Sequence, residues 1–183
     1  MKINFSPPDI TELEINEVVE ALKSGWITTG PRTKELERRI ATYLGTPKAV
    51  CLNSATAALE MILRVLGIGL GDEVITSAYS YTASASPVVH VGAKLVLIDT
   101  APDSYEMDYD KVAAAITDKT KAIIPVDIGG VPCDYDRLFT IVNDAKSLFV
   151  PSNDIQRALG RIPIVADCAP VSYTHLRAHE TGA

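Results

Sequence analysis

The stretch from residue 94 to residue 126, KLVLIDTAPDSYEMDYDKVAAAITDKTKAIIPV, contains two apolar runs separated by a segment of helical character. The runs, Lys94–Ile98 and Lys121–Val126, are rich in valine, isoleucine and leucine, which is typical of strands buried in a parallel sheet. The intervening segment Asp110–Ile116 predicts a helix. Strands that alternate with helices indicate an α/β layered domain, so this stretch decides the fold class.

The same alternation extends in both directions from this stretch. Further short strands are predicted at Lys48–Leu52, Glu73–Thr76 and Ile162–Ala166. Further helices are predicted at Ala55–Leu66, at Asp134–Val142, after the capping box Thr11-x-x-Glu14, and from Pro31 to just before Gly45. The apolar residues at helical spacing in the last two helices, among them Leu36 and Ile40, are expected to face inward.

The composition excludes several classes of protein. The chain has 183 residues and a net charge of -6, which provides no basic surface for nucleic acid. The first eight residues contain no apolar core of a secretory signal, and no run approaches the ~18 apolar residues of a membrane span. Three widely spaced cysteines favour reduced thiols. We therefore expect a cytoplasmic protein with neither nucleic-acid nor membrane partners.

The strongest local motif is Leu52-Asn53-Ser54-Ala55-Thr56-Ala57-Ala58, where a predicted strand gives way to a helix. The first turn of a helix has unpaired N–H groups and partial positive charge. Small residues let a phosphate approach that backbone, and the hydroxyls of Ser54 and Thr56 can add hydrogen bonds. Taken alone, the motif is also explained by an ordinary serine or asparagine helix cap.

Two further residues follow predicted strands, where ligands bind in α/β proteins. Tyr81 lies in Ser77-Ala78-Tyr79-Ser80-Tyr81-Thr82-Ala83-Ser84, and an aromatic ring there can stack on a flat heteroaromatic cofactor. Asp167 follows Ile162–Ala166, and its carboxylate could pair with a protonated pyridine nitrogen. Each also has an ordinary explanation, as a packing aromatic or as a loop acid.

Three other patterns are set aside. Gly67-x-Gly69-x-Gly71 follows a helix and precedes a strand, the reverse of the order that dinucleotide binding requires. His175 and His179 are four residues apart but have no evident third ligand. The acids Asp127, Asp134 and Asp136 could suggest a metal site, but helix capping and turn formation by Asp134 is the better explanation, so we expect no metal site.

Taken together, these motifs resemble the DegT/DnrJ/StrS family of pyridoxal-phosphate (PLP) dependent nucleotide-sugar aminotransferases. The resemblance runs in order to about Ala169. It rests on Ser24-Gly25-Trp26 with Gly30, Asn53–Leu59, Leu66–Gly69, Gly71–Thr76, Tyr79 with Tyr81, Gly92-Ala93, Val96–Asp99, Thr117–Ile123, Pro125–Asp127, Gly130–Pro132 and Asp134–Asp136.

The resemblance implies a fold and a set of roles. The fold is the large domain of aspartate-aminotransferase-like enzymes, a three-layer αβα arrangement around a mixed, mostly parallel sheet, here truncated. Ala55 and Thr56, with Ser54, would hold the PLP phosphate, Tyr81 would stack on the pyridine ring, and Asp167 would pair with its nitrogen. Trp26 would border the substrate pocket. Family members are usually homodimers whose substrates are nucleotide-sugars and amino acids.

The sequence departs from the family after Asp167. Pro170 stands where a polar residue should contact the cofactor, and the Schiff-base lysine expected further on is missing, since the last lysine is Lys146. We therefore interpret residues 1–170 as a partial PLP-transferase domain and residues 171–183 as a cloning or assembly artefact. The alternative for that tail is a native C-terminus.

The predicted function is transfer of an amino group, from glutamate by family inference, to a nucleotide-linked keto-sugar. The chain as given is expected to be inactive because it lacks the lysine. Three alternatives stay open: a dehydratase of the same family with histidine in place of the lysine, a non-catalytic sensor or binding relative, and an α/β binding domain without cofactor.

Overall fold

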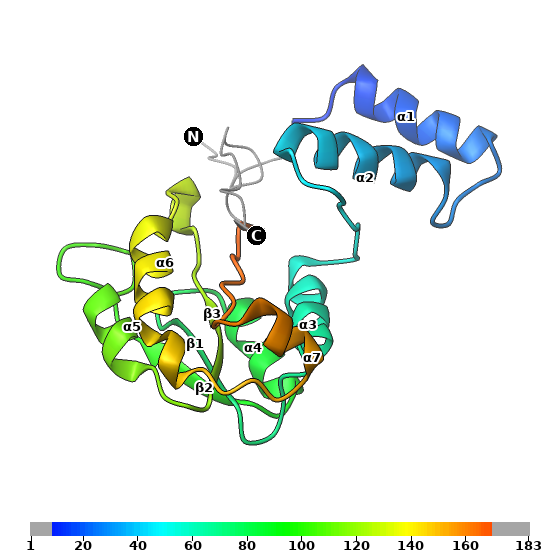
Figure 1. Ribbon diagram of the computed structural model, residues 1–183. Helices are drawn as coiled ribbons and strands as arrows, with labels where there is room; N and C mark the ends of the chain where they lie inside the picture. The colour runs from blue at the N-terminus through cyan, green and yellow to red at the C-terminus, as the bar shows by residue number, and fades with distance from the viewer. Residues whose placement is uncertain (1–8, 170–183) are drawn as a thin grey trace. The chain divides into compact units, whose positions relative to one another are not determined.

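The structure, a computed structural model, describes residues 9–169 and divides into two compact units, one ending at Cys51 and the other beginning at Leu52 (Figure 1). The first unit contains helices α1 (Glu12–Lys23) and α2 (Pro31–Leu44). The predicted capping box is confirmed, since Glu14 accepts a hydrogen bond from the Thr11 N–H at 2.7 Å. Helix α2 begins at Pro31 and is capped after Leu44 by Gly45, whose left-handed backbone (φ 68°) favours glycine.

Two predictions for the first unit are wrong. Leu36 and Ile40 were expected to face a core, yet both are exposed, and neither α1 nor α2 has a buried residue. The reason is that, within the described part of the first unit, α1 and α2 have only each other to pack against. Lys48–Leu52 forms no strand, because a strand requires a hydrogen-bonded neighbour and none lies beside this segment in the described structure.

The second unit is built on a parallel sheet with the strand order β2-β1-β3. The strands are β1 (Glu73–Ser77), β2 (Lys94–Ile98) and β3 (Thr120–Ile124), close to the predicted ranges. Glu73 pairs with Lys94 on one side of β1 and with Thr120 on the other. All three strands are therefore aligned with their carboxyl ends at one edge, which we call the carboxyl edge.

The predicted strand Ile162–Ala166 lies beside β3 but forms a discontinuous ladder. Two isolated parallel bridges join the segments, Ile123 with Ile164 and Val126 with Asp167. The Ile123 N–H donates to the Pro163 carbonyl and the Asp167 N–H donates to the Pro125 carbonyl, at 3.1 and 2.9 Å. Both prolines lack an N–H, which explains why the pairing is interrupted. The bridges nevertheless bring Asp167 to the carboxyl edge.

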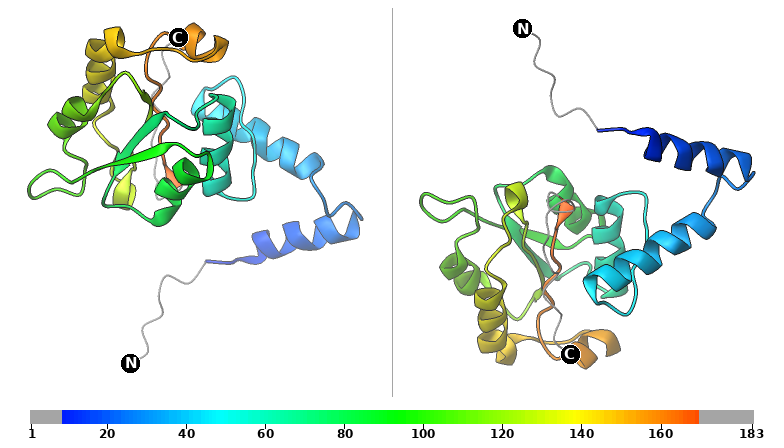
Figure 2. Two further views of the ribbon diagram at one scale, coloured as in Figure 1. Left: turned by 90° about the horizontal axis from the view of Figure 1, so that it is seen from below. Right: turned by 90° about the horizontal axis from the view of Figure 1, so that it is seen from above.

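Helices cover both faces of the sheet, which confirms the α/β layered fold (Figures 1 and 2). Helices α5 (Tyr109–Ala115) and α6 (Tyr135–Asp144) cover one face and pack on Ile75 and Ile123. Helices α3 (Ala55–Val65) and α4 (Thr82–His90) cover the other face and pack on Val74 and Ala122. Neighbouring residues of each strand thus enter opposite cores, as the period of a strand requires.

The remaining elements are short. They are the 3₁₀ turns η1 (Ile128–Gly130) and η2 (Ala145–Leu148) and the helix α7 (Asp154–Leu159). The sequence analysis predicted neither α4 nor α7. Gln156 of α7 is fully buried and its side-chain amide donates to the Leu66 carbonyl at 2.8 Å, so α7 closes the end of α3. No helix within residues 9–169 is long and apolar enough to cross a membrane.

Candidate functional site

The N-terminus of α3 is formed by the predicted phosphate-binding motif. Ser54 is the helix cap, and its Oγ accepts a hydrogen bond from the Ala57 N–H at 3.1 Å. The N–H groups of Ala55 and Thr56 have no hydrogen-bond partner within the described part of the chain. Ser54 and Ala55 are exposed and Thr56 is half-buried. These two unpaired N–H groups, flanked by small side chains, can therefore bind an anion.

The N-terminus of α3 lies at the carboxyl edge of the sheet. Helix α4 connects β1 to the parallel strand β2, so it begins at that edge and ends at the opposite one. The segments after α3 and α4 are neighbours, because a Cβ on Gly69 would be 3.4 Å from the Val91 carbonyl oxygen. Helices that end together and pack side by side also begin together. The first turns of α3 and α4 therefore share one edge with Asp167.

Asp167 is connected to the first turn of α4 by a direct hydrogen bond. The Ser84 hydroxyl donates to Asp167 Oδ2 at 2.7 Å, and both residues are buried. Asp167 Oδ1 accepts the N–H of Ala169 at 3.2 Å. The Ser84 N–H in turn donates to the Tyr81 carbonyl at 3.1 Å. The structure thus brings Tyr81 and Asp167 to the same place, with Ser84 between them.

The aromatic ring of Tyr81 is exposed and unstacked in the described structure, whereas the ring of its neighbour Tyr79 is stacked on another ring. Tyr81 caps α4 and is 80% exposed. Tyr79 stacks on Tyr105 with 5.4 Å between ring centroids, whereas no aromatic ring of residues 9–169 stacks on Tyr81. A planar ligand could therefore stack on Tyr81 without displacing another side chain.

The carboxyl edge holds a second buried acid, Asp127, which faces the other layer. Asp127 follows β3 and lies one strand away from Asp167, whose carbonyl accepts its N–H at 3.1 Å. Its carboxylate accepts hydrogen bonds from the Tyr135 hydroxyl (2.9 Å), the Cys133 N–H (2.9 Å) and the Cys168 thiol (3.1 Å). Asp127 therefore faces α6, and only Asp167 faces the layer formed by α3 and α4.

The groups around Asp127 are protonated donors. Burial, with the nearby Asp127 carboxylate, raises the pKa of the Cys133 and Cys168 thiols to about 12. Burial also raises the pKa of the Tyr135 hydroxyl well above its ordinary value. Each group keeps its proton at neutral pH. The Tyr135 hydroxyl and the Cys168 thiol donate to Asp127, whereas the Cys133 thiol donates to the Val126 carbonyl at 3.3 Å. This cluster fixes the turn after β3 and leaves Asp167 as the acid available to a ligand.

The residues present fit a planar, phosphorylated, nitrogen-containing cofactor. The first turn of α3 offers free N–H donors, Tyr81 offers an open ring face, and Asp167 offers a buried carboxylate. Sequence reasoning selected these positions but missed Ser84 and Ser80. Their spacing of four residues just after a strand, typical of one face of a helix, is the signal that could have identified them.

The lysines of the second unit do not complete this site. Lys94 and Lys121 belong to the starts of β2 and β3, opposite the carboxyl edge, and pair with Glu73 and with the Asp118 and Val150 carbonyls. Lys119 lies just before β3 at the same end of the sheet, where its carbonyl accepts the Glu73 N–H. Lys111 forms an ion pair with Asp108 on α5, and Lys146 belongs to η2, after α6.

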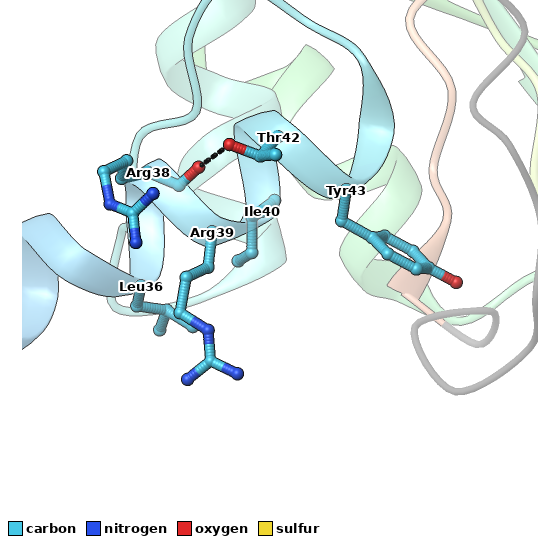
Figure 3. A pocket seen from close by; sticks show the side chains of 6 residues that line it. All are labelled: Leu36, Arg38, Arg39, Ile40, Thr42 and Tyr43. Atoms are coloured by element: carbon cyan, nitrogen blue, oxygen red, sulfur yellow. Dashed lines mark hydrogen bonds between the residues drawn. The ribbon is translucent and has the colours of Figure 1, made fainter.

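One further predicted site residue, Trp26, belongs to the first unit. It is 57% exposed, and its indole N–H donates to the Thr29 carbonyl at 3.1 Å. The same unit has a shallow surface pocket on α2 (Figure 3), lined by Leu36, Arg38, Arg39, Ile40, Thr42 and Tyr43. This pocket contains none of the predicted cofactor residues. Substrate contact by Trp26 stays a prediction.

The three set-aside patterns have structural explanations where the structure describes them. The Gly67–Gly71 segment connects α3 to β1, and Asp134 caps α6 by accepting the Arg137 N–H at 2.9 Å. Residues 9–169 contain no cluster of side chains able to hold a metal ion. His175, His179 and the predicted boundary at residue 170 lie outside the described residues.

Comparison with known proteins identifies the family. The DegT/DnrJ/EryC1/StrS aminotransferase family matches residues 8–175. The putative sugar aminotransferase Spr1654 from Streptococcus pneumoniae, in its PLP form, superposes with a TM-score of 0.90 at 61% identity, over 92% of this chain and 43% of that one. The same protein has also been solved in a PMP (pyridoxamine phosphate) form.

Two relatives from other organisms are also similar to this chain in sequence. The spore coat polysaccharide biosynthesis protein SpsC of Bacillus subtilis is 41% identical over 80% of this chain and 37% of its own length. The UDP-4-amino-4-deoxy-L-arabinose–oxoglutarate aminotransferase of Shewanella sediminis is 36% identical over 96% of this chain and 41% of its own length. The chain spans about two fifths of the length of these relatives. It belongs to the DegT/DnrJ/EryC1/StrS aminotransferase family.

Proposed function

We propose that this chain is the cofactor-binding part of a PLP-dependent aminotransferase that moves an amino group from glutamate to a nucleotide-linked keto-sugar. The observation that carries the proposal is the position of Asp167, buried at the carboxyl edge beside the first turns of α3 and α4. When bound, PLP supplies an electron sink that lets an amino group pass between two carbon skeletons.

The residues of this chain have separate roles in the proposal. The N–H groups of Ala55 and Thr56, with the hydroxyls of Ser54 and Thr56, hold the phosphate. The ring of Tyr81 stacks on the pyridine ring, and the Asp167 carboxylate holds a proton on the pyridine nitrogen. That proton would make the ring a better acceptor of electrons, which is the reason for an acid at this position.

The proposed substrates rest on the relatives. One relative is named for a UDP-linked amino sugar and for oxoglutarate, the keto acid left when glutamate gives up its amino group. Another is named for polysaccharide biosynthesis. We also propose that the parent protein is a cytoplasmic homodimer and that Trp26 borders its sugar pocket. We further propose that the chain alone does not transaminate, because no lysine in the described part of the second unit contacts Asp167.

The proposal predicts binding of PMP, which needs no covalent bond to lysine. Titration followed by PMP fluorescence measures the affinity of the wild-type chain, D167N and D99N. Asp99 is a matched control, because it also follows a strand but is exposed. D167N should weaken binding by about tenfold or more, the order expected when a charged hydrogen bond is lost, and D99N should not. Equal affinity in all three would contradict the role of Asp167, and no binding by the wild type would contradict the proposed function.

A further inference from the structure

The side chains of Ser80, Ser84 and Asp167 form a continuous chain of hydrogen bonds. The two serine oxygens are 2.7 Å apart, and Ser84 Oγ is 2.7 Å from Asp167 Oδ2. Ser84 is 2% exposed and Asp167 is 6% exposed, whereas Ser80 is half-buried. Within residues 9–169, Ser84 is the side chain whose hydroxyl contacts this carboxylate.

Counting the protons shows which group is the donor in each of these two hydrogen bonds. A serine hydroxyl has one proton, and the carboxylate oxygen of Asp167 accepts rather than donates. The Ser84 proton is therefore directed at Asp167, and the Ser84 oxygen accepts the proton of Ser80. Hydrogen bonds linked in this way polarise and strengthen one another. The bond from Ser84 to Asp167 is thus stronger than an isolated serine–carboxylate contact.

These hydrogen bonds also determine the orientation of the Asp167 carboxylate. The backbone of Asp167 is held beside β3, since its N–H donates to the Pro125 carbonyl and its carbonyl accepts the Asp127 N–H. These backbone bonds leave the carboxylate free to rotate about its side-chain bonds. Ser84 fixes Oδ2 from the α4 side, and the Ala169 N–H fixes Oδ1 at 3.2 Å. With both oxygens held, the plane of the carboxylate is set before any ligand arrives.

We infer that Ser84, supported by Ser80, is a positioning residue that orients the Asp167 carboxylate toward the ring nitrogen of the bound cofactor. This inference rests on the proposed function, because it concerns the same site. Ser84 touches Asp167 and acts through it.

Two probes separate this role from a packing role. One is PMP, and the other is its 1-deaza analogue, in which a C–H group replaces the ring nitrogen, so that the ring has no N–H group to donate a hydrogen bond to the Asp167 carboxylate. In S84A the affinity for PMP should fall by about tenfold, the order expected for a lost hydrogen bond to a charged group. The affinity for the deaza analogue should not change. S84T, which keeps a hydroxyl, should restore most of the affinity for PMP.

The control is S86A, which makes the same change at a half-buried serine of α4 that has no contact with Asp167. If S84A does not fold, S84C gives the same contrast, because a thiol is a weaker donor of similar size. If S84A lost affinity equally for both probes, or lost affinity for neither, the positioning role of Ser84 alone would be overturned. A wild-type chain that bound neither probe would instead overturn the proposed function, and this inference with it.

Discussion

At the scale of single residues, Glu73 links stability to pH. It is buried at the start of β1, where it accepts hydrogen bonds from Lys94 Nζ at 2.8 Å and from the Thr117 hydroxyl at 2.7 Å. The hydrogen bond from Lys94, followed by that from Thr117, lowers the pKa of Glu73 below its ordinary value of 4.5. Because the folded state lowers this pKa, the contribution of Glu73 is complete above that ordinary value and is lost as the pH falls through the folded pKa.

The substitution E73Q should therefore destabilise the second unit at neutral pH. The expected loss is about 1 kcal/mol, the lower end for hydrogen bonds to a charged group, because Lys94 itself is exposed. Urea unfolding at several pH values measures it, and the difference from the wild type should vanish in acid. D118N, an exposed acid beside Thr117, serves as the control. A difference that persisted unchanged in acid would show that the charge of Glu73 is not what stabilises the fold.

Among the single residues of the site, some could be identified from the sequence and others could not. Asp167 and Tyr81 were predictable because each follows an apolar run, and the carboxyl ends of parallel strands are where ligands bind. Ser84 was not, since its importance comes from a contact with Asp167, 83 residues further along the chain. The structural role of Asp127 was not predicted, because its hydrogen-bond donors are brought to it by tertiary folding.

At the scale of elements, the N-terminus of α3 combines two functions in one residue. Ser54 caps the helix through the Ala57 N–H, and its hydroxyl lies where the cofactor phosphate is proposed to bind. S54A should lower the free energy of unfolding by about 1 kcal/mol, the usual cost of a lost cap. S54D should keep the cap, because aspartate is an equally good cap, but its charge should repel a phosphate.

Thermal melting and PMP titration of both variants separate the two functions of Ser54. The account predicts that S54D melts close to the wild type and binds PMP more weakly than S54A does. If S54D bound PMP as tightly as the wild type, the phosphate could not be held at the start of α3.

The elements themselves were predicted unevenly. Strands β1 and β3 were identifiable because their residues are buried on both faces. Strand β2 was identifiable from its run of leucine, valine and isoleucine, although part of it is exposed. Helix α4 was missed because serines and Pro87 weaken its helical pattern, and it forms because Val88 packs into a core shared with α3. Lys48–Leu52 has the composition of a strand, but pairing requires a neighbour, which a local pattern does not reveal.

At the scale of the whole molecule, apolar surface dominates the expected behaviour of the chain. Both helices of the first unit expose apolar side chains, and Leu97 of β2 is 53% exposed on an edge strand of the described sheet. Uncovered apolar faces and edge strands favour association. The 183-residue chain should therefore bind the dye ANS and self-associate.

Light scattering against concentration tests this expectation, and L97K should reduce the association because a charge protects a strand edge. A monodisperse sample with a cooperative melt and no dye binding would contradict it.

The most direct test of the central claim is nitrogen-15 NMR of PMP labelled at its ring nitrogen and bound to the chain. The account predicts a protonated pyridine nitrogen in the wild-type complex at a pH where free PMP has lost that proton. It predicts a deprotonated nitrogen in the D167N complex. A wild-type signal that titrated as free PMP does would show that Asp167 does not pair with the cofactor, and the proposed site would be wrong.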